Sequence, residues 1–115
     1  INKKRTPIHR GPFCYNTPMI KQLLLFKFKK EITPDVIDKF FISWSELVES
    51  IESVDSLEYG KNTSTEGYDQ DFTHAAIAYF KTEKDVAHFL VDKSHEKFVE
   101  ETMDPLLADI IILQI

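Results

Sequence analysis

The segment that decides the fold is Phe72–Phe98, which reads FTHAAIAYFKTEKDVAHFLVDKSHEKF. Its first part, Thr73–Phe80, has the alternation and the aromatic content of a strand and carries His74 at its entrance. The pattern of Thr82–Val91 then predicts a short helix, because a threonine is followed three positions later by an acidic residue. A second helical turn opens on His95. Both histidines therefore stand where they can line one apolar pocket, and histidine titrates near neutral pH.

The chain before this segment predicts a strand, a long helix and a second strand. Ile20–Lys29 alternates as a half-buried strand does, and Thr33 followed by proline and Asp35 begins a helix. A polar loop at 62–71 follows the strand Val54–Lys61. The helix carries a broad apolar stripe at spacings of three and four: Val36, Ile37, Phe40, Phe41, Trp44, Leu47, Val48 and Ile51.

The end of the chain predicts one more strand. Ile110–Leu113 is continuously apolar, which is typical of a fully buried strand. The order is then β-α-β-β-α-β, the α+β arrangement of ferredoxin-like folds, with both helices on one face of an antiparallel sheet. Strand positions on the other face are apolar as well. A sheet that is apolar on both sides needs a partner, and a homodimer is the simplest one.

Composition limits the classes of function. The 115 residues suffice for one domain with one core, and the net charge of −5 argues against nucleic-acid binding. A lone cysteine, Cys14, suits a reducing compartment, either the cytoplasm or an organelle. No apolar run approaches the roughly 20 residues of a membrane span. Residues 1–19 hold prolines, four basic residues and no acid, so we expect an extended N-terminal arm before a domain at 20–115.

Four pieces of the sequence, in this order, resemble the stress-responsive A/B barrel (Dabb) family. They are Ile20–Lys29, Tyr59–Asn62, Phe72–Ala75 and Ser94–Val99. The resemblance spans residues 20–115. It implies a ferredoxin-like protomer and a homodimer in which two sheets pack into a dimeric α+β barrel.

The resemblance also implies a pocket. In a plant polyketide cyclase of this family, a histidine of the helical turn is the general base of an aldol condensation that needs no cofactor, and a tyrosine of the preceding helix assists it. His95 matches this histidine, whereas Phe89, which has no hydroxyl, stands in place of the tyrosine. Two further polar pocket positions are matched by Gln22 and His74. The matching apolar pocket positions are Phe40, Phe41, Trp44 and Phe98.

Some members of the family hold a magnesium ion through main-chain carbonyls at the end of the first helix. The matching positions are Val48, Ile51 and Val54, and their side chains say nothing for or against an ion. No glycine-rich phosphate loop, nucleophile signature or metal-ligand spacing points to another cofactor.

Three functions are compatible with these residues. The first is a homodimer that binds a small apolar or aromatic molecule, with its molecular activity unassigned. The second is a cofactor-independent cyclase or lyase with His95 as the general base. The third is a structural or assembly protein whose cavity is filled by its own side chains. A small apolar pocket with one histidine serves binding and catalysis alike.

Overall fold

The computed structural model describes residues 18–115. The predicted arm at 1–19 lies outside these residues except for Pro18 and Met19, which lead into the first strand. The elements in chain order are β1 (Ile20–Phe28), α1 (Pro34–Ser50), β2 (Ser56–Lys61), β3 (His74–Phe80), α2 (Glu83–Leu90), α3 (Lys93–Phe98), the π-helical segment η2 (Val99–Met103), α4 (Asp104–Leu106) and β4 (Leu107–Gln114).

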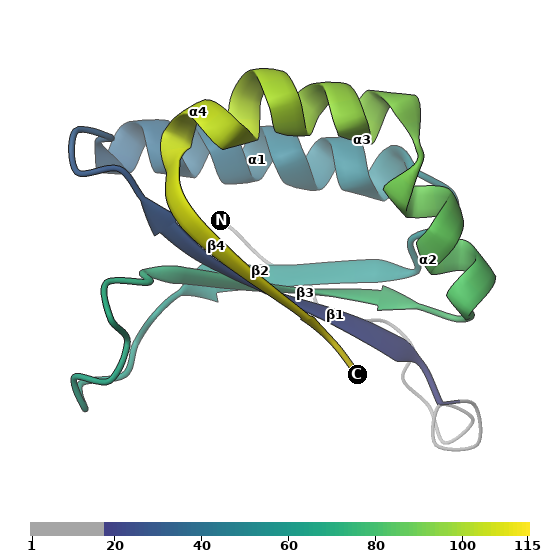
Figure 1. Cartoon of the computed structure of the whole chain (residues 1–115), viewed down its shortest axis with the longest axis horizontal. Helices are drawn as coiled ribbons and strands as arrows, with labels where there is room; N and C mark the ends of the chain where they lie inside the picture. Colours follow the sequence, from purple (N-terminus) through teal and green to yellow (C-terminus); the bar gives the residue numbers. More distant parts are fainter. Residues whose placement is uncertain (1–17) are drawn as a thin grey trace.

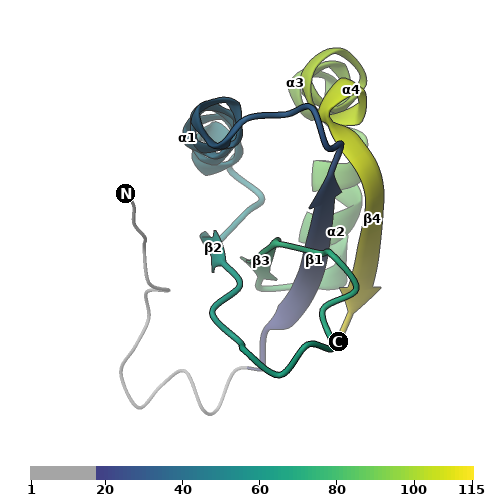
Figure 2. The ribbon, with the colours of Figure 1, turned by 90° about the vertical axis from the view of Figure 1, so that its left-hand side faces the viewer.

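The four strands form one antiparallel sheet in the order β2-β3-β1-β4. The helices of the described chain lie together over one face of this sheet, and none of them lies over the other face (Figure 1). Figure 2 shows α1 above the β2 side and α3 and α4 above the β4 side. The α+β, ferredoxin-like architecture predicted from the sequence is thereby confirmed.

Two helix starts form at the predicted threonines. The Oγ1 of Thr33 accepts a hydrogen bond from the amide of Val36 at 3.4 Å, and the Oγ1 of Thr82 accepts one from Asp85 at 3.1 Å. Each bond satisfies an amide that the helix itself leaves without an acceptor. The threonine caps therefore fix where α1 and α2 begin.

The predicted helical turn around His95 is the start of a longer helical run. From Lys93 to Leu106 the segments α3, η2 and α4 follow one another without a break in helical backbone. The sequence did not indicate this length, because Pro105 reads as a helix breaker. The proline instead directly follows the π-helical segment η2, whose last bond runs from the Asp104 amide to the Val99 carbonyl, and the helical backbone continues through it into α4.

The core lies between the helices and the sheet. Phe26 of β1 is fully buried at its centre, and its ring contacts those of Phe40, Phe41 and Trp44 at centroid distances of 6.1, 5.1 and 5.6 Å. All three partners come from the predicted apolar stripe of α1. The stripe is thus mainly core.

The helix-free face of the sheet, called the open face below, is also apolar. The pairing places the following residues on it: Leu23, Leu25, Ala75, Ile77, Ile111 and Leu113. The prediction that Ile110–Leu113 is a fully buried strand is wrong for the protomer, because β4 is an edge strand. Ile112 is 52% exposed and Leu113 57% exposed.

Candidate functional site

The predicted base, His95, lies in the first turn of α3 with its ring against an aromatic neighbour. Asp92 caps this helix and accepts a hydrogen bond from the His95 amide at 3.0 Å. The imidazole packs on the ring of Phe89 in α2, with 4.1 Å between centroids. Its Nδ1 atom is buried and has no hydrogen-bond partner among the residues that the structure describes. The cap and the Phe89 contact together hold the ring at the edge of the core.

Burial controls the protonation of this histidine. It lowers the pKa of His95 below its ordinary value of 6.5, and the negative charges of Asp92 and Glu96 raise it by less. The lowered pKa favours the neutral ring at neutral pH. A neutral imidazole whose Nδ1 meets no donor or acceptor of the protein can accept a hydrogen bond or a proton from a bound molecule.

Gln22 lies at the same end of the helix-covered face as His95. It is buried on β1 and pairs with Ala78 of β3, next to the row in which Ile20 pairs with Phe80. The ring of Phe80 in turn contacts that of Phe89 at 5.4 Å. Gln22 and Phe80 are therefore diagonal neighbours on one face, about 7–8 Å apart. Gln22 and Phe89 thus lie beside Phe80, and His95 adjoins Phe89.

Four predicted apolar pocket residues pack on one another. Phe40 contacts Phe41 at 5.0 Å, Trp44 at 6.0 Å and Phe98 of α3 at 5.9 Å. Trp44 is 1% exposed, and within residues 18–115 its indole Nε1 has no hydrogen-bond partner. Buried polar atoms without a partner are rare in proteins. The indole N–H is the second such atom on the helix-covered face.

His74 lies far from His95. It stands at the start of β3, six residues from Phe80, which corresponds to about 20 Å along a strand. Its ring stacks on Phe41 at 5.2 Å and meets the edge of Phe28 at 5.5 Å, while Thr73 Oγ1 lies 2.8 Å from its Nδ1. Burial and the charge of Lys61 lower the pKa of His74. The two histidines therefore contact different aromatic residues at opposite ends of β3.

Comparison with known proteins identifies the family. A model of the Stress responsive A/B Barrel Domain matches residues 20–115. The chain belongs to the stress-responsive A/B barrel family. One relative is the stress-response A/B barrel domain-containing protein HS1 of Arabidopsis thaliana, which is 29% identical over 79 residues, covering 69% of this chain and 72% of HS1. Olivetolic acid cyclase of Cannabis sativa is 25% identical over 79 residues, covering 69% of this chain and 78% of the cyclase.

Solved structures share the Dabb architecture. The crystal structure of At3g17210 from Arabidopsis thaliana has a TM-score of 0.78 at 25% identity and covers 84% of this chain and 92% of its own. A dimeric ferredoxin-like protein from Thermobifida fusca has a TM-score of 0.72 at 20% identity, covering 84% of this chain and 89% of its own. At that identity the likeness concerns the fold alone.

The magnesium site implied by the Dabb resemblance falls on carbonyls that are already used. Val48 O accepts a hydrogen bond from Ile51 N at 3.0 Å, and Ile51 O accepts one from Val54 N at 3.1 Å. Each of these two oxygens keeps one further lone pair, so an ion would bind in addition to these bonds. Within residues 18–115, no group of three or more His, Cys, Asp or Glu residues could hold a metal. The same residues contain no helix long and apolar enough to cross a bilayer.

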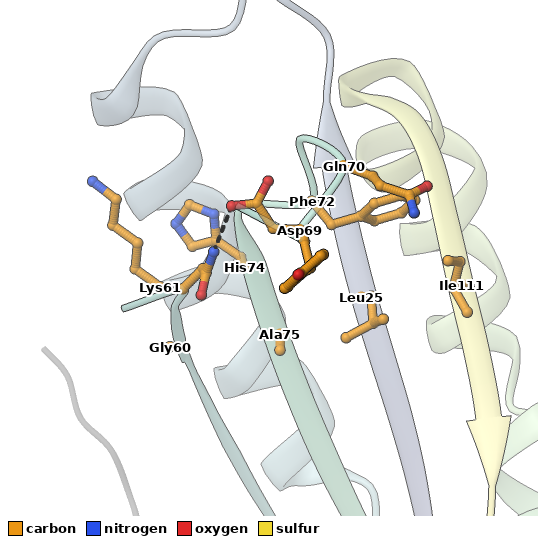
Figure 3. Close-up of a pocket in the computed structure, with 11 residues that line it drawn as sticks. Leu25, Gly60, Lys61, Asp69, Gln70, Phe72, His74, Ala75 and Ile111 are labelled. Atoms are coloured by element: carbon orange, nitrogen blue, oxygen red, sulfur yellow. Dashed lines mark hydrogen bonds between the residues drawn. The ribbon is translucent and has the colours of Figure 1, made fainter. Parts of the chain in front are cut away.

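One pocket of this Dabb domain was not predicted from the sequence. It lies between the loop at 62–73 and the open face, has a volume of about 380 Å³, and is lined by Leu25, Gly60, Tyr68, Phe72, Ala75 and Ile111 among others (Figure 3). Its floor is deep because Gly60 and Ala75, which pair across β2 and β3, have almost no side chain. Gly60 was the sequence signal for this pocket, since a glycine within a strand often marks a place where another group approaches the backbone closely.

Proposed function

We propose that this protein is a homodimer that binds a small apolar or aromatic molecule at the His95 end of the helix-covered face. The observation that carries the binding proposal is the buried, unpartnered Nδ1 of His95, packed on Phe89. Apolar surroundings with a few polar atoms at fixed positions are what a small-molecule site needs. The molecular activity beyond binding is left unassigned.

The homodimer is supported by the open face of the sheet. Three large side chains of β4 are exposed there or at its edge: Ile111 by 38%, Ile112 by 52% and Leu113 by 57%. Leu23 and Ile77 continue the apolar surface across β1 and β3. A contiguous apolar area of this kind is the usual mark of an interface. The dimeric Thermobifida fusca protein with the same fold agrees with this arrangement.

The ligand proposal concerns Gln22, Phe89 and His95 rather than the Phe40–Trp44 cluster. The cluster fills its own space, since its rings lie 5.0 to 6.1 Å apart. At the other end, Phe89 lies buried against Phe80 and His95, and His95 supplies a nitrogen acceptor. A small aromatic molecule with one hydroxyl, such as a phenol or naphthol, suits these surroundings because its ring is apolar while its O–H donates to the imidazole.

Calorimetric titration with 1-naphthol tests the ligand site. We expect saturable binding that His95→Phe weakens by roughly tenfold, because the hydrogen-bond acceptor is lost while the ring is kept. His88→Phe is the matched control, since His88 is exposed on α2 next to Phe89 in sequence. Saturable binding that both variants leave unchanged contradicts the site. No binding of naphthol or related phenols favours the structural or assembly function.

Sedimentation velocity tests the dimer separately. We expect the mass of two chains at micromolar concentration and the mass of one chain for Leu113→Asp, because a carboxylate buried in an apolar interface has no partner there. Asp substituted for Ile42, which is 49% exposed on α1, is the control and should leave the dimer intact. A monomeric wild-type protein would refute the proposal.

The second candidate is a cofactor-independent cyclase or lyase with His95 as the general base. It is favoured by the lowered pKa of a half-buried imidazole and by the likeness to olivetolic acid cyclase. A neutral imidazole can take a proton that is flanked by carbonyl groups. Phe89 supplies no hydroxyl to assist it. Turnover of a linear polyketide thioester that is lost in His95→Ala but kept in His88→Ala would establish this function. Equal turnover in both variants would exclude His95 as the base.

A further inference from the structure

The pocket beside Gly60 is a hollow in the open face. Gly60 pairs with Ala75, Ala75 with Leu25, and Leu25 with Ile111, so these four residues form one row across all four strands. Gly60 and Ala75, at one end of the row, have almost no side chain, whereas Leu25 and Ile111, at the other end, have large ones. A second apolar sheet laid on this face would leave a void over Gly60 and Ala75 unless a large side chain entered it. Packed interiors contain few voids of that size.

The loop at 62–73 forms a fixed wall of this hollow. Asn62 Nδ2 donates to Asp69 Oδ2 at 2.9 Å (Figure 3). The main-chain amide of Asp71 donates to Asp69 Oδ1 at 3.0 Å. The main-chain N–H of Asn62 donates to the Thr73 carbonyl at 2.8 Å, which closes the loop at its base. These bonds hold Gln70 and Asp71 in the left-handed region, with φ of 53° and 69°.

Tyr68 stands out in this wall. It is 83% exposed, the highest value among the exposed large apolar and aromatic side chains of the described residues, and it lines the hollow. Exposed tyrosines on fixed loops are frequent anchors of interfaces, since the ring contributes a large contact area and loses little conformational entropy.

We infer that the hollow is a socket of the homodimer interface, in which a large apolar side chain from the open face of a second copy lies over Gly60 and Ala75 and against Tyr68. The inference rests on the proposed dimer. In a two-fold dimer the socket occurs twice, so each copy both inserts and receives a side chain. The β2–β3 loop then determines how the two sheets register on one another.

Two observations favour a second copy over a small molecule as the occupant. The floor is continuous with the apolar open face through Leu25 and Ile111, so whatever covers that face also covers the hollow. Two polar side chains of the wall, those of Asn62 and Asp69, bond to each other and to the loop backbone. Lys61 extends away from Ala75 and Leu25 (Figure 3). The floor itself, formed by Leu25, Gly60, Ala75 and Ile111, is apolar and offers no side-chain group to orient a polar ligand.

Gly60→Val fills the socket without disturbing the protomer. A Cβ built at Gly60 meets no atom within 4 Å, and valine is well suited to a strand. We expect the dimer dissociation constant, measured by sedimentation equilibrium, to rise by roughly tenfold or more, with an unchanged far-UV circular dichroism spectrum. Tyr68→Ala should raise it by a similar factor. Ile42→Ala on α1 is the control and should leave it unchanged.

The possible results separate this inference from the proposed dimer. A wild-type protein that is monomeric at all concentrations refutes the dimer and the socket together. A wild-type dimer whose dissociation constant changes by less than about twofold in both variants refutes the socket and leaves the dimer standing. If Gly60→Val instead abolishes binding of anilinonaphthalene sulfonate and leaves the dimer unchanged, the hollow is a small-molecule site and the inference is wrong.

Discussion

Replacing Trp44 by Phe tests whether its indole N–H is truly buried without a partner. The side chain is 1% exposed and packed between Phe26 and Phe40. The change removes roughly two methylene equivalents, which costs about 2–3 kcal/mol of unfolding free energy through lost transfer free energy and the space left behind. It also removes an unsatisfied buried donor, whose desolvation penalty is about 1–3 kcal/mol. The two effects oppose each other, so we expect a net change within about 1 kcal/mol.

Phe40→Leu is the matched control. Phe40 is 3% exposed and stacks on Trp44 with ring centroids 6.0 Å apart, so both residues belong to one packed layer. The change to leucine deletes a comparable amount of apolar volume but relieves no polar group. We therefore expect a loss of about 2–3 kcal/mol, from lost transfer free energy and the space left behind.

Urea unfolding followed by far-UV circular dichroism measures both variants. Fluorescence is unsuitable, because Trp44 is the one tryptophan in the sequence. Protein concentration must be the same throughout, since dimerisation adds a concentration-dependent contribution to stability. If Trp44→Phe loses as much free energy of unfolding as Phe40→Leu or more, the indole N–H has a hydrogen-bond partner in solution. It is then not an unsatisfied buried donor.

Three further predictions concern the His95 region and the carbonyls that follow α1. Because burial lowers the pKa of His95 in the folded state, the unfolded chain binds more protons below pH 6.5, and the free energy of unfolding falls as the pH falls through 6.5 towards the lowered pKa. His95→Gln should flatten this pH dependence in urea unfolding between pH 7 and 5. An unchanged slope would contradict the prediction. Asp92→Ala should cost about 1 kcal/mol of unfolding free energy through the lost cap of α3, whereas Asp92→Asn, which also caps, should cost clearly less, and equal losses would show that the cap is not the cause. Millimolar Mg²⁺ added after chelation should leave the melting temperature unchanged, because within residues 18–115 no carboxylate cluster adds its charge to the remaining lone pairs of the Val48 and Ile51 carbonyls; an increase of several degrees would reveal a site.

Local patterns predicted the element types and several boundaries. The strand β1 begins at Ile20 as expected, and Thr33 and Thr82 cap α1 and α2 because a side-chain oxygen three residues before an amide reaches it without help from the rest of the fold. The apolar stripe of α1 predicted which face is buried for the same reason. Whether this stripe forms core or the wall of a pocket was harder to infer, since Phe40, Phe41 and Trp44 suit both.

The sequence alone therefore determined the β-α-β-β-α-β order, the helix caps and the family, and it predicted His95 as the candidate general base. These depend on contacts within a few residues or on matched spacing along the chain. Only the tertiary structure decided that β4 is an exposed edge, that His74 and His95 lie at opposite ends of β3, and that a hollow opens beside Gly60. Strand order and the distances between elements arise from pairings between residues remote in sequence, and periodicity in one strand carries no information about its neighbour.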